Sequence, residues 1–356
     1  MIRIQTIGLV LAATILSAVP MAGQPSRLPG VRTVTDSLGR TVAIPGRVER
    51  ILSLQPEVTR IIVALGAGER LVGVDYFIRA HDHLFPIIYP EGRNLPAVSN
   101  TPEDMNFEMA MKLDPDIIFA SPTELRMVDS LQDKMRIPVV ALASMGSFEK
   151  LLGEIVLVGS ALGREERAAS LVNAFRSRLS GVRQAVSPIP RERRPRVYLS
   201  FWGTLTRTPV SYEPVETAGG LNCASGLLPA YLGTIATVVQ VEQIVRWQPD
   251  IVLVQGNYPP AERSVSAESF LRDPRFRSLP AVRDNKVRYT FGFWYWWDPA
   301  EVLVETLYLA DLFHPGVMGD FDLEKEGNAV FKEFYGIEGG FSTLCRILAC
   351  GGWDED

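Results

Sequence analysis

The chain has 356 residues, of which 47% are hydrophobic and 22% are charged, and its formal net charge is −5 at pH 7. This length exceeds what a single hydrophobic core usually supports, so we expect two domains. The composition is that of an ordinary globular protein, which excludes a disordered or membrane-embedded chain. The negative charge and the lack of a basic stripe argue against a nucleic-acid-binding protein.

Residues 1–23 predict a secretory signal peptide. One positive charge, Arg3, precedes an apolar run at 7–16, and small residues follow at 18–23. The apolar run is shorter than the ~20 residues that cross a bilayer, so a retained membrane anchor is the weaker interpretation. We therefore expect an exported chain whose signal is removed.

The segment after the signal predicts an α/β domain. Residues 31–45 alternate like a β-hairpin that turns near 37–39. Strands are expected at 50–54, 71–74 and 139–142, with helices at 57–65, 124–135 and 148–162; Ser147 is the expected N-cap of the last. The long polar and aromatic loop 75–96 follows a strand, which is where α/β folds place ligand contacts.

Residues 165–187 predict one long charged helix that connects this domain to a second one. The helix ends in a Pro- and Arg-rich break, SPIPRERRP, which is typical of a domain boundary. The second domain is expected to contain strands at 196–201 and 286–290 and a helix at 298–314. One more amphipathic helix and a loose tail are expected after it.

An internal repeat indicates that the two domains are alike. Residues 105–120 and 239–255 share a glutamate, a Pro-Asp pair separated from it by six residues and a β-branched run, and Glu108 and Glu242 are 134 residues apart. Each copy reads as a short helix, a proline that stops it and a buried parallel strand. The predicted organisation is a signal peptide (1–23), an N-terminal α/β lobe (31–164), a linking helix (165–187), a C-terminal α/β lobe (188–315) and a C-terminal helix with a tail (316–356).

No catalytic residue is predicted, because the sequence lacks GxGxxG after a strand, GxxxxGK[ST], HExxH and GxSxG. His81, Asp82 and His83 are the one candidate metal group. They lack a third and fourth ligand at a convincing spacing, so an ordinary exposed pair of histidines is preferred and no metal site is predicted.

The three cysteines, Cys223, Cys345 and Cys350, do not form a disulfide framework or a zinc motif. Export permits a disulfide, and Cys345 and Cys350 are near enough in sequence to pair. Whether they do is left open by the sequence, as is the role of Cys223.

Several segments, taken in order, resemble one family. They are DSLGRTVAIPGRVERILSLQPEVTRIIVALGAGERLVGV (36–74), NFEMAMKLDPDII (106–118), ETAGGLN (216–222), LPAVRDNKV (279–287) and KEFYG (332–336). They are similar to landmarks of the class III periplasmic binding proteins, which carry ferric siderophores, haem or cobalamin to ABC importers. The resemblance implies two Rossmann-like α/β lobes, one long connecting helix, a ligand cleft between the lobes and a periplasmic location.

The resemblance also implies a partner. In this family one acidic residue on each lobe docks with arginines of the dimeric permease, which works with its ATPase, and Glu108 and Glu242 match those positions. Two exposed carboxylates on related lobes can meet two basic sockets and so orient the complex. The alternative is that each glutamate only favours the first turn of its helix. The protein itself is expected to be a monomer.

The cleft residues are predicted from their positions after strands. Aromatic side chains suit a large flat or chelated ligand, and arginines balance an anionic one. Of the aromatic run at 291–297, roughly half is expected to line the cleft and the rest to pack in the core. The predicted ligand residues are Tyr76, Phe77, Arg79, Trp202, Arg207, Tyr212, Tyr258, Trp294, Tyr295 and Trp296, with Gln55, Asn100, Thr123 and Asn257 as further candidates.

The preferred cargo is a ferric siderophore or a related iron chelate, followed by a corrinoid or haem; no other cofactor is expected. A molybdate or tungstate oxyanion is an alternative. Free zinc or manganese is disfavoured because histidines are few. An exported enzyme, such as a metal chelatase, is a different class that would need a titratable cluster in the cleft. The sequence alone does not identify the cargo.

Overall fold

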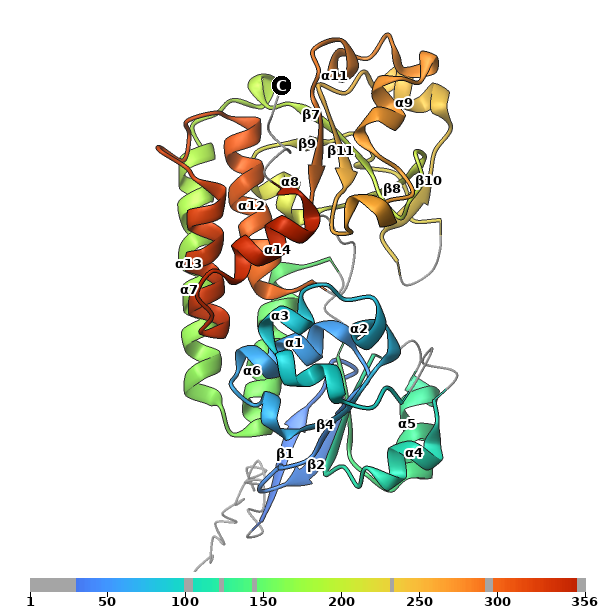
Figure 1. Ribbon diagram of the computed structural model, residues 1–356, viewed down its shortest axis with the longest axis vertical. Coiled ribbons are helices and arrows are strands. Elements are labelled where there is room, and N and C mark those ends of the chain that lie inside the picture. Colours follow the sequence, from blue (N-terminus) through green and yellow to red (C-terminus); the bar gives the residue numbers. More distant parts are fainter. Residues whose placement is uncertain are drawn as a thin grey trace, which may run out of the picture.

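The computed structural model describes residues 30–98, 105–121, 125–142, 146–230, 234–291 and 297–350. Two α/β lobes are stacked along the long axis, and helix α7 (Glu165–Val186) runs along one side and joins them (Figure 1). The predicted architecture of two lobes and one long connecting helix is therefore confirmed.

The N-terminal lobe contains a four-stranded parallel sheet in the order β4-β3-β5-β6. Helices cover the sheet, so its strands are apolar without alternation. The strands are β3 (Ile51–Ser53), β4 (Leu71–Val74), β5 (Ile117–Ala120) and β6 (Val139–Ala141), beside the hairpin β1 (Val31–Thr35) and β2 (Thr41–Pro45). The helices are α1 (Pro56–Ala64), α2 (Tyr76–Ala80), α3 (Phe85–Ile88), α4 (Phe107–Lys112), α5 (Leu125–Met135) and α6 (Phe148–Leu162).

The C-terminal lobe repeats this sheet in the order β12-β11-β7-β9, again parallel. Its strands are β7 (Arg196–Ser200), β9 (Leu221–Asn222), β11 (Ile251–Gln255) and β12 (Val287–Thr290), with a short antiparallel pair, β8 (Arg207–Pro209) and β10 (Ala236–Val238). The helices are α8 (Glu213–Thr217), α9 (Val241–Trp247), α10 (Ala267–Leu271), α11 (Pro280–Arg283), α12 (Pro299–Phe313), α13 (Leu323–Tyr335) and α14 (Gly340–Leu348).

The sequence repeat corresponds to α4-β5 in one lobe and α9-β11 in the other. Just after each helix one residue takes a left-handed conformation, Asp114 with φ 45° and Gln248 with φ 47°. A proline follows each of them, so the two helices end in the same way.

The aspartate of each copy holds the neighbouring strand. The Asp116 carboxylate accepts hydrogen bonds from the backbone N–H of Glu49 (2.7 Å) and Arg50 (2.9 Å), just before β3. The Asp250 carboxylate accepts one from the backbone N–H of Arg196 (2.8 Å), at the start of β7. These bonds link the two central strands of each lobe at their beginnings, β3 with β5 in one lobe and β7 with β11 in the other.

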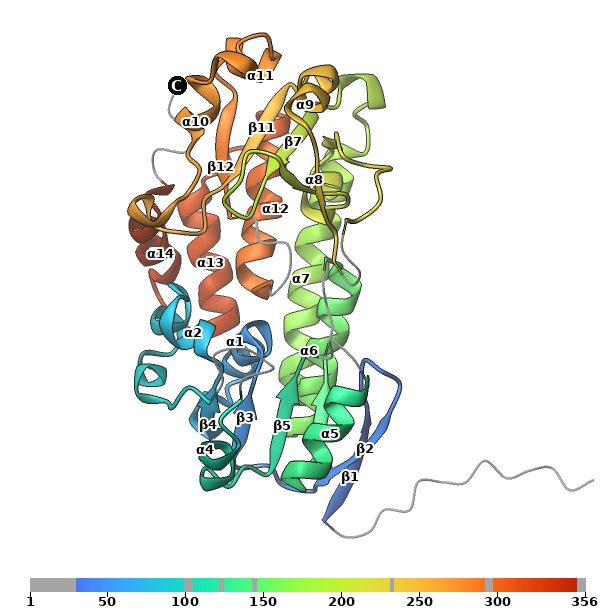
Figure 2. The same ribbon diagram turned by 90° about the vertical axis from the view of Figure 1, so that its right-hand side faces the viewer.

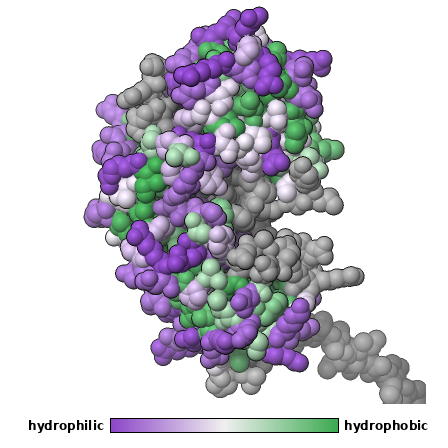
Figure 3. All heavy atoms as spheres, turned by 45° about the vertical axis from the view of Figure 1, so that its right-hand side comes forward, coloured by the Kyte–Doolittle hydropathy of each residue, from purple (hydrophilic) through white to green (hydrophobic). Residues whose placement is uncertain are grey.

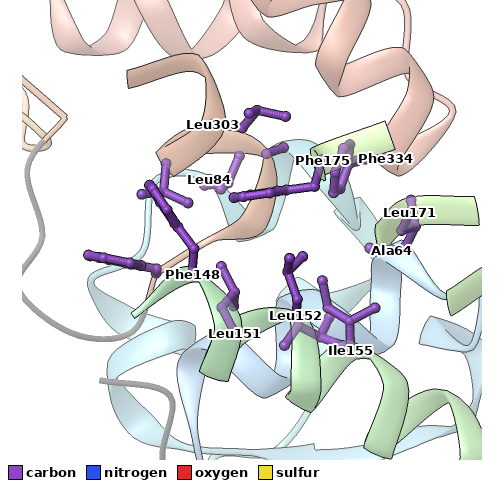
Figure 4. Close-up of a cluster of buried hydrophobic side chains, with 14 of the residues drawn as sticks. Ala64, Leu84, Phe148, Leu151, Leu152, Ile155, Leu171, Phe175, Leu303 and Phe334 are labelled. Carbon is purple, nitrogen blue, oxygen red and sulfur yellow. The ribbon is translucent and has the colours of Figure 1, made fainter. Parts of the chain in front are cut away.

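One hydrophobic core runs through both lobes. Figure 4 shows residues of α1, α6 and α7 meeting Leu303 of α12 and Phe334 of α13. The rings of Phe148 and Phe175 are 5.5 Å apart, and Phe148 is 5.4 Å from Trp297. Because packed cores resist deformation, this shared core favours small movements between the lobes.

One local expectation was wrong, and another was confirmed only in part. Residues 340–348 form helix α14 rather than a loose tail, because Phe341, Leu344 and Leu348 follow helical spacing and are all buried. Ser147 is the N-cap of α6, but its side chain makes no cap bond; the Glu213 carboxylate of the other lobe accepts the Phe148 N–H instead.

Cys223, Cys345 and Cys350 are free thiols. Of the helices that the structure describes, none combines the length and apolar character that crossing a bilayer requires.

Candidate functional site

The candidate site lies at the waist, between the two lobes. The central strands of both sheets point toward the waist (Figure 2), and the surface is indented between the lobes on this side (Figure 3). The carboxyl ends of parallel strands are where α/β folds bind ligands. Residues that follow β3, β4, β7 and β11 are therefore the first to consider.

Several buried polar atoms near these strand ends have no hydrogen-bond partner among the described residues. They include Asp75 Oδ2 after β4, Gln55 Oε1 after β3, Asn257 Oδ1 after β11, and Arg207 Nε at the start of β8. The Arg207 backbone is bonded to Phe201, the residue that follows β7. A buried polar atom without a partner costs ~1–3 kcal/mol, so its retention calls for an explanation such as a ligand.

Trp202 follows β7 in a left-handed conformation, with φ 56°. Its backbone N–H donates to Gln255 Oε1 (2.7 Å), and Gly203 continues the turn with φ 64°. The left-handed region costs a non-glycine residue about 1–2 kcal/mol, and such strain gathers at ligand sites. The turn thus fixes a half-buried tryptophan at the carboxyl edge of the sheet.

The N-terminal lobe places Tyr76 and Phe77 at the beginning of α2, directly after β4. Tyr76 is 40% exposed, so its ring is available to a ligand. Arg79 is exposed and its Nε donates to the Leu95 carbonyl (3.2 Å), which ties it to a loop of its own lobe.

The prediction that Tyr212 lines the cleft was wrong. Its side chain is 0% exposed, and its hydroxyl donates to the buried carboxylate of Glu305 (2.7 Å). The ring packs edge-on against Phe201 and Trp297 at 5.3 and 5.9 Å. Tyr212 therefore belongs to the core beneath the site.

Part of the predicted site lies outside the described residues: Asn100, Thr123, Trp294, Tyr295 and Trp296. The two ends of the aromatic run are described. Phe291 and Trp297 are 2% and 3% exposed, so both ends of the run are in the core.

A buried charged cluster beside the site was missed by sequence reasoning. Arg60 of α1 is 7% exposed and forms an ion pair with Asp82. Burial lowers the pKa of Arg60, but the Asp82 and Asp298 carboxylates hold it above its ordinary value. Burial raises the pKa of Asp75 to about 7. Burial also raises the pKa of Asp298, although nearby Arg60 opposes this shift.

The contacts of this cluster account for the position of the loop that carries His81, Asp82 and His83. Arg60 pairs with Asp82, and His83 Nε2 lies 3.1 Å from Glu262 Oε2 of the other lobe. Within the part of the chain that the structure describes, no three His, Cys, Asp or Glu residues form a possible metal site. The loop of His81, Asp82 and His83 is thus tied to the charged cluster through Asp82 and to the other lobe through His83.

The two glutamates of the repeat lie in the first turns of α4 and α9, and these helices are on the same side as the indentation (Figure 2). The Glu108 side chain is 79% exposed and pairs with Lys112 at 2.7 Å. Glu242 is exposed as well. Both carboxylates are therefore accessible on one face of the molecule.

Comparison with known proteins agrees with the two-lobed fold. A family model described as periplasmic binding protein matches residues 51–291. The molybdate-binding protein MolA of Haemophilus influenzae is 24% identical over 332 residues, covering 85% of this chain and 91% of that protein. A cobalamin-binding protein of Halobacterium salinarum is 25% identical over 232 residues, covering 62% of this chain and 58% of that protein. The structure of H. influenzae MolA bound to molybdate has a TM-score of 0.73 to this chain, at 23% identity, covering 86% of this chain and 98% of that one.

Proposed function

The chain belongs to the periplasmic binding protein family, and on this premise we propose that it is the exported receptor of an ABC importer whose cargo is an oxyanion of the molybdate or tungstate type. Membership of the family makes it a substrate-binding protein. The cargo, the periplasmic location and the docking residues are the proposed parts.

One observation carries the choice of an anion. The buried Nε of Arg207 has no acceptor within the described residues, and it lies next to the strained turn at Trp202. A guanidinium donates to oxyanions in a fixed planar geometry and stays charged at any physiological pH. The likeness to a molybdate-binding protein over 85% of this chain supports an oxyanion rather than an anion of another kind.

A second cargo is favoured by a different observation. Gln55 Oε1 and Asn257 Oδ1 are acceptors without partners, and a bare oxyanion offers them no donor. A ferric siderophore with amide N–H groups would satisfy both, which keeps the iron chelate as the alternative. Bound water can also fill this role in the oxyanion complex.

Calorimetric titration of the purified protein with molybdate, tungstate, sulfate, a ferric hydroxamate, cyanocobalamin and haemin separates these cargoes. We expect saturable binding of molybdate and tungstate only. Arg207→Gln should weaken it at least tenfold, because a charge-assisted hydrogen bond is lost. Arg277→Gln, at an exposed arginine of the same lobe, is the matched control. Binding of the ferric hydroxamate alone would select the alternative, and no binding in the panel would refute both.

Glu108 and Glu242 are proposed to dock on the permease. The ion pair between Glu108 and Lys112 is exposed and contributes only ~0.3–0.5 kcal/mol, so a permease arginine can displace the lysine. Exposed apolar side chains lie near both glutamates in sequence: Met109 and Met111 on α4, and Val238 just before α9. The two lobes thus present a similar acidic and apolar surface to a two-fold symmetric partner.

A further inference from the structure

The loop at 256–262 carries two of the candidate cleft residues, Asn257 and Tyr258. It follows β11 and ends in a short turn of 3-10 helix, Pro260–Glu262. Its first residue still pairs with the sheet, because the Gly256 N–H donates to the Thr290 carbonyl of β12 (2.8 Å). Within the described part of the chain, the loop residues that follow have no backbone hydrogen bond to a strand of the sheet, so their position depends on what anchors them. A ligand site needs its contact residues held to within about half an ångström.

Arg263 is the anchor. Its Nε donates to the Tyr258 carbonyl (2.9 Å) and its Nη2 to the Gly256 carbonyl (3.2 Å), so one guanidinium holds both neighbours of Asn257. The guanidinium carbon is 4.2 Å from the centre of the Tyr289 ring on β12. The Tyr289 hydroxyl accepts from the Ala267 N–H (3.0 Å), which fixes that ring.

The same guanidinium reaches the C-terminal helix. Nη2 of Arg263 also donates to the carbonyl of Leu348, the last residue of α14, where the helix dipole favours a cation. Helix α14 lies at the waist in both ribbon views (Figures 1 and 2). Its Phe341 ring packs against Phe291, the residue after β12, at 5.6 Å. Helix α14 therefore touches the chain after β12 and, through Arg263, the loop after β11.

The other end of the loop is tied to the opposite lobe, because Glu262 meets His83 at 3.1 Å. The loop is thus held between the N-terminal lobe, β12 and α14.

We propose that Arg263 is a positioning residue that sets Asn257 and Tyr258 for the cargo, and that α14 acts through it, so that the C-terminal helix belongs to the ligand-binding machinery. This inference rests on the proposed function for its ligand. Its structural part concerns the loop alone.

Amide hydrogen exchange on the ligand-free protein tests the structural part. In Arg263→Gln we expect the hydrogen-bonded amides of the loop, Gly256 and Glu262, to exchange at least tenfold faster, while β7 and β11 keep their protection. Arg263→Lys should behave like Arg263→Gln, because one ammonium cannot span three carbonyls. If lysine restored slow exchange in the loop, the positive charge alone would explain the effect, and the proposal would be overturned. Leu344→Ala, which loosens α14 without touching Arg263, should also speed exchange in 256–262, and an unchanged loop would remove α14 from the proposal.

A double-mutant cycle with sodium molybdate tests the ligand part. Arg263→Gln should weaken binding roughly tenfold or more, as loss of a residue that orients ligand contacts does. In a background that carries both Asn257→Ala and Tyr258→Ala, the same change should weaken it less than twofold. Equal weakening in both backgrounds would mean a merely structural role. If the wild-type protein binds no cargo, the proposed function fails, and the exchange experiment alone decides the role of Arg263.

Discussion

Arg167 of α7 joins the two lobes through backbone carbonyls, and its replacement by alanine should destabilise the whole protein. Its Nε donates to the Ala64 carbonyl (3.1 Å) at the end of α1. Its Nη2 donates to the carbonyls of Glu333 (2.7 Å) and Phe334 (2.8 Å), near the end of α13. One side chain on the connecting helix thus satisfies the C-termini of two helices that are distant in sequence.

The size of the effect follows from these contacts. A hydrogen bond to a charged group contributes ~1.5–3 kcal/mol, but three that share one donor group do not add. Burial lowers the pKa of Arg167, which shows that the guanidinium is partly desolvated and that its net contribution is reduced. We expect Arg167→Ala to lower the free energy of unfolding by about 2–4 kcal/mol. At ~2 °C per kcal/mol for a chain of this size, the melting temperature should fall by about 4–8 °C.

Urea and thermal unfolding followed by circular dichroism measure this change. Arg183→Ala is the matched control, since Arg183 lies on the same helix and is exposed; it should cost less than about 0.5 kcal/mol. Arg167→Lys should fall between them, because an ammonium reaches fewer carbonyls. If Arg167→Ala were no more destabilising than Arg183→Ala, the account of the lobe junction would be refuted.

Three further predictions concern the site. Trp202→Gly should resist urea better than Trp202→Ala by about 1 kcal/mol, because only the backbone strain differs between them; an alanine variant as stable as the glycine variant would contradict the strain. Burial raises the pKa of Asp75 to about 7, from an unfolded value near 3.9. The protonated carboxyl therefore stabilises the fold at low pH, and this contribution of roughly 2–4 kcal/mol is lost as pH rises from about 4 to 7. Asp75→Asn should flatten the pH dependence of the urea midpoint between about pH 4 and 7, and an unchanged slope would rule out this carboxyl. Glu108→Ala combined with Glu242→Ala should abolish uptake into cells or vesicles while calorimetric cargo affinity stays unchanged; lost affinity would instead place these residues in the cleft.

Most of the fold could be predicted because its strands and helices carry local signals. Buried parallel strands appear as short apolar runs, and α6 and α7 have strong helical periodicity between clear stops. Helix α14 was not predicted, because it begins after Gly339 and contains few strong helix formers. Its stability comes from packing of Phe341 on Phe331, which depends on a distant part of the chain.

The site was predictable only to the level of strand ends. Gln55, Trp202 and Asn257 could be placed at this edge because they follow parallel strands, and topology alone brings such positions together; their contact with a ligand stays a prediction. The face that a loop residue presents is not encoded in its neighbours, so Tyr212 was wrongly placed in the cleft. Arg263 was missed for a related reason: its partners are backbone carbonyls, which any residue supplies.

The core shared by the lobes bears on how the chain is made. Residues of α1, such as Ala64, pack with Phe334 of α13, which the ribosome adds some 270 residues later. Arg167 likewise bonds to α13 carbonyls that are synthesised much later, since Glu333 follows it by 166 residues. The part of the N-terminal lobe's core that packs on α13 can therefore form only after the C-terminal helices have emerged. Late formation of this contact would keep the chain loose during the export that we propose.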